Sequence, residues 1–206
     1  MRTWPTTLAG RVGQVLLGLV MASVGIWLSI RANLGVASWE VLHIALAQRL
    51  GVGVGTASIA VGCLLVAVVA ALGVGPGIGT ILNVLVIGVC LNLLLALPML
   101  TSVRTQGVPE RLGILLLGIM VFAIGCAVYV GAHLGSGPRD GLMLALHLRL
   151  RLGIGGARFL SEGIGLGIGW SLGGPAGIGT LLFVVAVGPA VALAFRVLRL
   201  RPLAET

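Results

Sequence analysis

The tetrapeptide Gly77-Ile78-Gly79-Thr80 recurs letter for letter one hundred residues later, as Gly177-Ile178-Gly179-Thr180. Further residues are identical at the same offset: Arg11, Gly18, Gly25, Leu34, Gly35, Leu42 and Arg49, matched by Arg111, Gly118, Gly125, Leu134, Gly135, Leu142 and Arg149. A two-copy repeat in an apolar chain is typical of transporters whose halves face each other across a site. We therefore predict two membrane repeats, residues 11–99 and 111–198, joined by a linker at 100–110.

The composition places most of the chain in a lipid bilayer. Hydrophobic residues make up 58% of it and charged residues 9%, with a mean hydropathy of +1.18. A soluble domain is about half apolar and about a quarter charged. This chain therefore lacks the polar surface that a globule needs in water, and we expect an integral membrane protein in contact with lipid.

The net charge of +8 comes entirely from arginine, because the chain has no lysine. A strongly basic soluble protein would suggest a nucleic-acid partner. Here the arginines lie between apolar runs, which is the pattern of cytoplasmic loops in membrane proteins. We therefore interpret the charge as a signal of topology and expect no nucleic acid.

Three apolar runs in each half approach the roughly 20 residues that a helix needs to cross a bilayer. The runs are 12–30, 57–72 and 81–97, then 112–130, 159–172 and 181–198. A shorter helix is predicted in each half, at 38–50 and 138–150. The expected fold is an all-α polytopic bundle of two repeats, each with three long helices and one short helix. Thirteen residues reach only about 20 Å, so the short helices could be short spans, re-entrant half-helices or interfacial helices.

The arginine count favours short helices that cross. If they do not cross, each half has three spans, the halves are inverted, and nine arginines lie inside against Arg31, Arg49, Arg104 and Arg111 outside. If they cross, each half has four spans, the halves are parallel, and eleven arginines lie inside against Arg31 and Arg139 outside. Because positive loops stay in the cytoplasm, we predict two parallel halves with both termini cytoplasmic.

Polar residues inside a membrane are costly and indicate functional sites. Glu40 and Asp140 occupy equivalent positions in the first turns of the two short helices. They could form an acidic pair that binds a cation or a proton, or they could simply complement the helix dipoles. Arg139 could pair with Glu40 between the halves, and Trp39 occupies the matching place in the first copy.

Further polar residues are weaker candidates. His43 follows Glu40 by three residues and shares its helix face. Asn33 and His133 match each other just before Gly35 and Gly135, where they could line a cavity or cap a helix. The sequence alone does not decide between these roles.

Thr80 and Thr180 end the two identical tetrapeptides, at the expected starts of long helices. Glycine-rich backbone at a helix start offers free N–H groups to an anion or another polar ligand. The same glycines could equally serve tight turns. Glu162 is an unmatched acid, and Arg158 lies four residues before it, so a local ion pair is the simplest expectation.

The residues give little support to catalysis. The chain has no Ser/His/Asp arrangement, and Cys63, Cys90 and Cys126 stand alone at spacings that do not suit a metal. We therefore expect no enzyme, no cofactor and no metal.

The chain resembles the bacterial YczE/YyaS/YitT family of integral membrane proteins, nearest its YczE members. The residues that carry the resemblance are Asn33–Val36, Trp39–His43, Gly77–Asn83 and Gly135–Met143. The resemblance implies a multispanning protein of the bacterial cytoplasmic membrane, and it assigns no residue a role.

These patterns together predict a small-molecule or ion transporter with a site between the two repeats. The site would be lined by Glu40, Asp140, Arg139, His133, Asn33, Thr80 and Thr180, all toward the external side. The alternative is a non-transporting scaffold or accessory subunit of a membrane complex. A homo-oligomer or a membrane partner protein is compatible with either.

Overall fold

The computed structural model describes residues 7–135 and 137–200, which form eight α-helices and one 3₁₀ helix with no strand. Arg2, Ser136 and Arg201 lie outside the described residues. The elements are α1 Leu8–Ala32, α2 Ser38–Leu50, α3 Val54–Ala71, α4 Ile78–Ala96, η1 Thr101–Thr105, α5 Val108–Val130, α6 Pro138–Leu150, α7 Ile154–Ser171 and α8 Ile178–Leu198. The two short helices, α2 and α6, have the bounds expected from the sequence.

Five of these helices, α1, α3, α4, α5 and α8, are long and apolar enough to cross a membrane. The helix α7 has 18 residues, as α3 does, but it is not one of these five apolar helices. It carries Arg158, Glu162 and six glycines, which lower its apolarity. The chain is therefore a membrane protein with at least five apolar helices.

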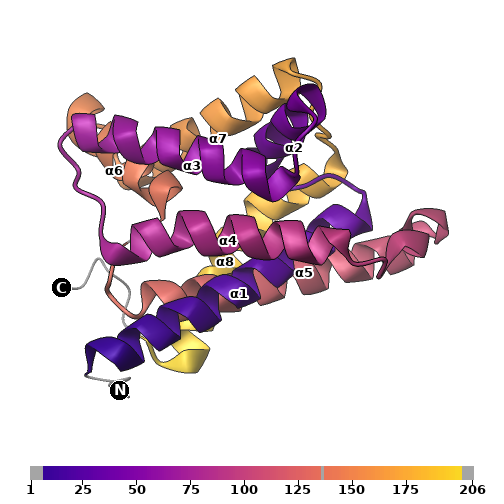
Figure 1. Ribbon diagram of the computed structural model, residues 1–206, viewed down its shortest axis with the longest axis horizontal. Helices are drawn as coiled ribbons and strands as arrows, with labels where there is room; N and C mark the ends of the chain where they lie inside the picture. The colour runs from indigo at the N-terminus through magenta and orange to yellow at the C-terminus, as the bar shows by residue number, and fades with distance from the viewer. Residues whose placement is uncertain (1–6, 136, 201–206) are drawn as a thin grey trace.

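The most extensive contact between helices is a close antiparallel pair formed by α1 and α5 (Figure 1). A Cβ added at Gly18 would lie 2.5 Å from Tyr129 N, and one at Gly25 would lie 2.5 Å from Phe122 N. Glycine thus lets the two backbones touch, as small residues do between membrane helices. Buried Val15, Leu19, Leu115 and Ile119 fill the core beside this contact.

Arginines close both ends of this pair. Arg11, at the start of α1, donates from Nε to the Ala132 carbonyl at 2.7 Å. Arg111, at the start of α5, donates from Nε to the Ala32 carbonyl at 3.0 Å. Each arginine thereby binds carbonyl groups that the end of the other helix leaves unpaired, which only an antiparallel arrangement allows.

The expectation of two parallel halves is therefore wrong. Four spans in each half would make α1 and α5 parallel, whereas they run in opposite directions. The arginine count failed because Arg11, Arg111, Arg49 and Arg149 bind helix ends in the structure, so their positions do not report topology alone.

The helices form two layers, which Figure 1 shows one above the other. One layer contains α1, α4, α5 and α8, and the other contains α2, α3, α6 and α7. The layers meet chiefly where α3 packs against α4, with a minor contact between α4 and α6. The helix α7 packs against α2 and α6 and has no comparable contact with α8.

Four connectors join the two layers, and each contains a glycine in the left-handed region. The φ angles are 117° at Gly35, 92° at Gly73, 125° at Gly135 and 84° at Gly173. Residues with a Cβ rarely adopt such angles. The path of the chain between the layers therefore depends on glycine at these turns.

The contact between α1 and α5 predicts a sharp difference between two glycines of the same helix. Gly25→Ala places a methyl group against the α5 backbone, whereas Gly13→Ala meets nothing within 4 Å. We expect Gly25→Ala to destabilise the protein by about 1–3 kcal/mol, the usual cost of overpacking, and Gly13→Ala to have little effect. Thermal unfolding of the purified protein in detergent measures both. Equal melting temperatures would contradict the close contact.

Candidate functional site

The first turns of α2 and α6 meet inside the molecule, and the two helices point away from each other. Their C-terminal residues are exposed, and each carries an arginine that reaches the end of a long helix. Arg49 donates to the Leu172 carbonyl at 3.1 Å, and Arg149 donates from Nε to the Leu72 carbonyl at 3.2 Å. The positive ends of two helix dipoles are therefore directed at one interior region.

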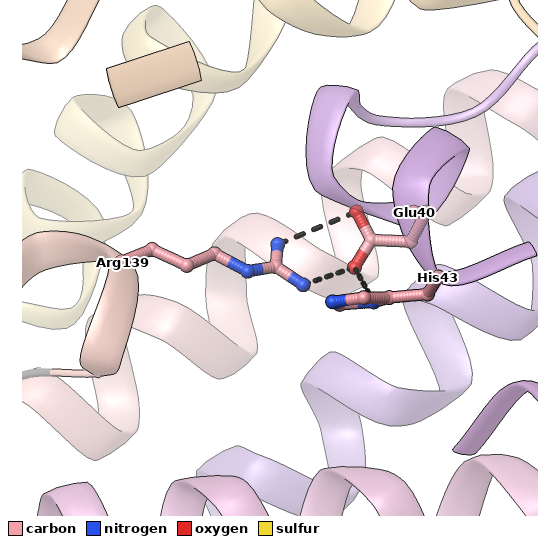
Figure 2. A network of polar contacts seen from close by, with 3 residues as sticks. All are labelled: Glu40, His43 and Arg139. Carbon is pink, nitrogen blue, oxygen red and sulfur yellow. Dashed lines mark hydrogen bonds and ion pairs between the residues drawn. The ribbon is translucent and has the colours of Figure 1, made fainter. Parts of the chain in front are cut away.

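An ion pair joins the two first turns there (Figure 2). Arg139 on α6 donates from Nη1 to Glu40 Oε2 at 3.3 Å and from Nη2 to Glu40 Oε1. The Glu40 side chain is only 2% exposed, and that of Arg139 is 25% exposed. The sequence offered this pairing as one possibility, and in the structure the two residues meet.

Two more polar groups adjoin the pair. His43 Nδ1 lies 3.9 Å from Glu40 Oε1 on the same face of α2, as the three-residue spacing predicted. On the other helix, Asp140 accepts a hydrogen bond from the Tyr129 hydroxyl at 3.3 Å. Glu40 and Asp140 thus have different partners, although both interact electrostatically with Arg139.

The ion pair expected between Glu162 and Arg158 is absent from the described part of the chain. Glu162 on α7 instead lies within electrostatic range of Arg139, while Arg158 is exposed. The fold brings Glu162 to this cluster because α7 packs along α2 and α6.

A small cavity opens beside the ion pair, with a volume of about 20 Å³. That space holds about one water molecule. Its polar lining comes from four helices: His43 on α2, Ser58 on α3, Asn83 on α4 and Arg139 on α6. His43 Nδ1 and Trp39 Nε1 are buried nearby without a hydrogen-bond partner among the described residues. Unpaired buried donors and acceptors are rare and call for an explanation.

The tetrapeptides at the starts of α4 and α8 serve a structural role. Thr180 Oγ1 accepts hydrogen bonds from Gly177 N and Val36 N, and Thr80 Oγ1 accepts one from Gly77 N. The N–H groups of Gly79 and Gly179 donate to the Leu134 and Leu34 carbonyls, both at 2.8 Å. These donors, expected to be free for a ligand, bind protein backbone instead.

Asn33 and His133 lie at helix ends, where both adopt left-handed φ angles of 51° and 53°. Their carbonyl groups accept hydrogen bonds from Arg111 and Arg11. Since α1 and α5 are antiparallel, the two residues lie at opposite ends of the bundle, with Thr180 near the first and Thr80 near the second. The expectation that all seven candidates face one side is therefore wrong, and only Glu40, Arg139 and Asp140 form a cluster.

Tyr129 was missed by the sequence analysis, although it is the chain's single tyrosine and is placed within a long apolar run. Ser58 was also missed, because a serine in an apolar helix gives no signal of where it points. Asn92 on α4 accepts a hydrogen bond from Gly55 N on α3 at 2.8 Å. No three potential ligands gather closely enough to hold a metal ion within residues 7–135 and 137–200.

The geometry thus defines a helical membrane protein with a charged cluster buried between two short helices. The chain belongs to the family described as "Family of unknown function (DUF6198)", which matches residues 9–196.

Two relatives align with most of the chain. It is 34% identical to the "Uncharacterized membrane protein YczE" of Bacillus subtilis (strain 168), over 83% of this chain and 79% of the relative. It is 32% identical to an "Uncharacterized protein" of Haemophilus influenzae, over 87% of this chain and 81% of the relative. The resemblance seen in the sequence is thereby confirmed. No solved structure matches the chain.

The buried ion pair predicts strong coupling between its two members. Arg139→Gln leaves the Glu40 carboxylate buried without a counter-ion, which costs about 3 kcal/mol of unfolding free energy. The double variant Glu40→Gln/Arg139→Gln removes both charges, so we expect it to recover much of that loss. Unfolding midpoints of the single and double variants form the double-mutant cycle. Arg196→Gln, at an exposed arginine of α8, is the matched control and should change little. Additive losses would show that the two charges do not interact.

Proposed function

We propose that the chain consists of two inverted repeats, α1–α4 and α5–α8, related by a rotation about an axis between α1 and α5. The support is a set of contacts that each occur twice: a residue of the first half binds one of the second half, and the two residues at equivalent positions, one hundred residues away, bind each other in the same way. Arg11 binds Ala132 as Arg111 binds Ala32, Arg49 binds Leu172 as Arg149 binds Leu72, and Gly79 binds Leu134 as Gly179 binds Leu34. Contacts of this exchanged form are the signature of a two-fold relation.

In this arrangement each repeat crosses the membrane three times, and α2 and α6 are re-entrant half-helices. Inverted repeats whose interrupted helices meet near the midplane are common in transporters. Six crossings place both termini on the same side. We propose the cytoplasmic side of the bacterial cytoplasmic membrane, because that places eight arginines inside and four outside, with Arg139 buried between the short helices.

The inverted topology makes a labelling prediction. The C-terminal ends of α2 and α6 lie at opposite ends of the bundle, so Arg49→Cys and Arg149→Cys should face opposite sides of the membrane. Each is made with Cys63, Cys90 and Cys126 replaced by serine. An impermeant maleimide should label one variant in intact cells and the other only after permeabilisation. Labelling of both from the same side would contradict inversion.

We further propose that the protein transports a small solute or ion, without catalysing a reaction. The observation that carries this proposal is the Glu40–Arg139 pair with its polar cavity, at the meeting point of the two short helices. Charged groups at this depth in an apolar bundle are expensive and mark solute or proton pathways. A purely structural role would be met more cheaply by apolar packing.

The unequal packing of the two layers supports movement between them. The contact of α3 with α4 has no comparable counterpart between α7 and α8. If the repeats exchange these roles, α7 closes on α8 while α3 leaves α4, and the site opens to the other side. Rocking of this kind is how inverted repeats produce alternating access.

Cysteine pairs test this exchange. A Cβ at Gly62 would lie 3.4 Å from Val84 Cβ. The two Cβ atoms of a disulfide are usually about 3.5–4.5 Å apart. We expect Gly62→Cys/Val84→Cys to cross-link readily, and Glu162→Cys/Val184→Cys, at the equivalent positions, to cross-link more slowly. Adding the first disulfide should block the second. If residues 162 and 184 never cross-link under oxidation, the layers do not exchange, which favours the scaffold or accessory role instead.

A further inference from the structure

We propose that Arg139 is the recognition group for a small carboxylate, which enters together with one proton and displaces Glu40 from the guanidinium. This inference rests on the proposed transport function and names its substrate class and coupling ion. In the structure, Glu40 occupies the position that the substrate carboxylate would take.

The geometry of the ion pair is the first support. The two terminal nitrogens of Arg139 each bind one oxygen of Glu40. Such paired hydrogen bonds are the way a guanidinium recognises any carboxylate, because its planar donors match the two oxygens. A carboxylate that arrives from solution would find the same donors once Glu40 swings away.

The surroundings of the pair also suit an anion. Both α2 and α6 start here, so two helix N-termini add positive potential to that of Arg139. The His43 side chain is only 3% exposed and lines the cavity, and its Nδ1 has no hydrogen-bond partner among the described residues. Ser58 and Asn83 supply further polar groups across that cavity. These polar groups are not hydrogen-bonded to Glu40 and can bind an oxygen of the ligand.

The site is single, although the proposed repeat is double. The equivalent of Arg139 is Trp39, whose ring packs against Gly165 on α7. The equivalents of His43 and Asn83 are Met143 and Phe183. The second copy therefore has large apolar side chains at these three positions, and the guanidinium it offers, Arg158 at the equivalent of Ser58, is exposed.

Charge balance requires the proton. The ionisable groups around the pair are Glu40 and His43 on α2, Arg139 and Asp140 on α6, Glu162 and Arg158 on α7, and Cys126 and Tyr129 on α5. On the cavity wall, α3 and α4 add only uncharged polar groups. Displaced from Arg139, the Glu40 carboxylate would be buried without a counter-ion, which is strongly unfavourable. One proton taken up by Glu40 or His43 cancels that charge, so anion and proton enter together with no net charge moved.

Formate is the probe, because it is small and remains ionised between pH 5 and pH 8. The cavity holds about one water while Glu40 occupies Arg139, so binding requires the displacement. For the wild-type protein in detergent, we expect formate to raise the melting temperature with an apparent affinity that increases about tenfold for each unit of pH lowered, the signature of one linked proton. Sodium chloride at equal ionic strength is the reference.

Glu40→Gln should remove the competition and the proton together. We expect it to bind formate at pH 7 at least about tenfold more tightly than wild type, with affinity independent of pH, because no carboxylate remains to be displaced. Adding Arg139→Gln should abolish the formate effect. Glu110→Gln, at an exposed acid in the first turn of α5, is the matched control and should behave as wild type.

Two results would overturn the inference: wild-type binding of formate that is independent of pH, or no stabilisation of either wild type or Glu40→Gln by formate. The wild-type pH series stands even if Glu40→Gln proves unstable. Failure of this inference is separable from failure of the transport proposal, because the cysteine pairs report layer exchange without any ligand. Exchange without formate binding would reject the substrate class alone, and formate binding without exchange would support the site and reject transport.

Discussion

The close approach of α1 and α5 is the contact on which the rest of the structure depends. Their backbones touch at Gly18 and Gly25, where any Cβ would collide with the facing helix. This contact fixes the two helices as antiparallel neighbours, and α4 and α8 then pack on them to complete one layer. Because the layer is built around glycine, its geometry tolerates little change in side-chain volume at the crossing points.

Arginine has a second role in this protein, besides any effect on topology. Arg11, Arg111, Arg49 and Arg149 each reach carbonyl groups at the end of another helix. Helix ends leave such carbonyls unpaired, and an unpaired carbonyl is costly wherever water is scarce. The long side chain and forked donors of arginine suit this task better than lysine. The arginines therefore hold segments from the two halves of the chain together, which is why counting them as free loop charges gave the wrong relative direction of α1 and α5.

The interior charge cluster is the other exceptional feature. In an apolar bundle, Glu40, Arg139, Asp140 and Glu162 gather where two helix N-termini meet. Their charges offset one another in part, and the helix dipoles stabilise the acids. The arrangement remains incompletely satisfied, since His43 Nδ1 and Trp39 Nε1 lack hydrogen-bond partners among the described residues. A buried charged cluster with unpaired hydrogen-bonding groups is better suited to exchanging one bound carboxylate for another than to adding stability.

The sequence by itself determined the membrane class and the bounds of α2 and α6. These follow from local quantities, namely the length of apolar runs, the glycine breaks and the scarcity of charge. Only the tertiary structure decided that α1 and α5 are antiparallel, that α3 packs on α4 without a comparable counterpart between α7 and α8, and that Tyr129 and Glu162 join the cluster. The reason is physical. Matching residues stand at the same offset along the chain whether the two copies are parallel or inverted, and the relative direction of α1 and α5 is set by backbone contacts between residues far apart in sequence.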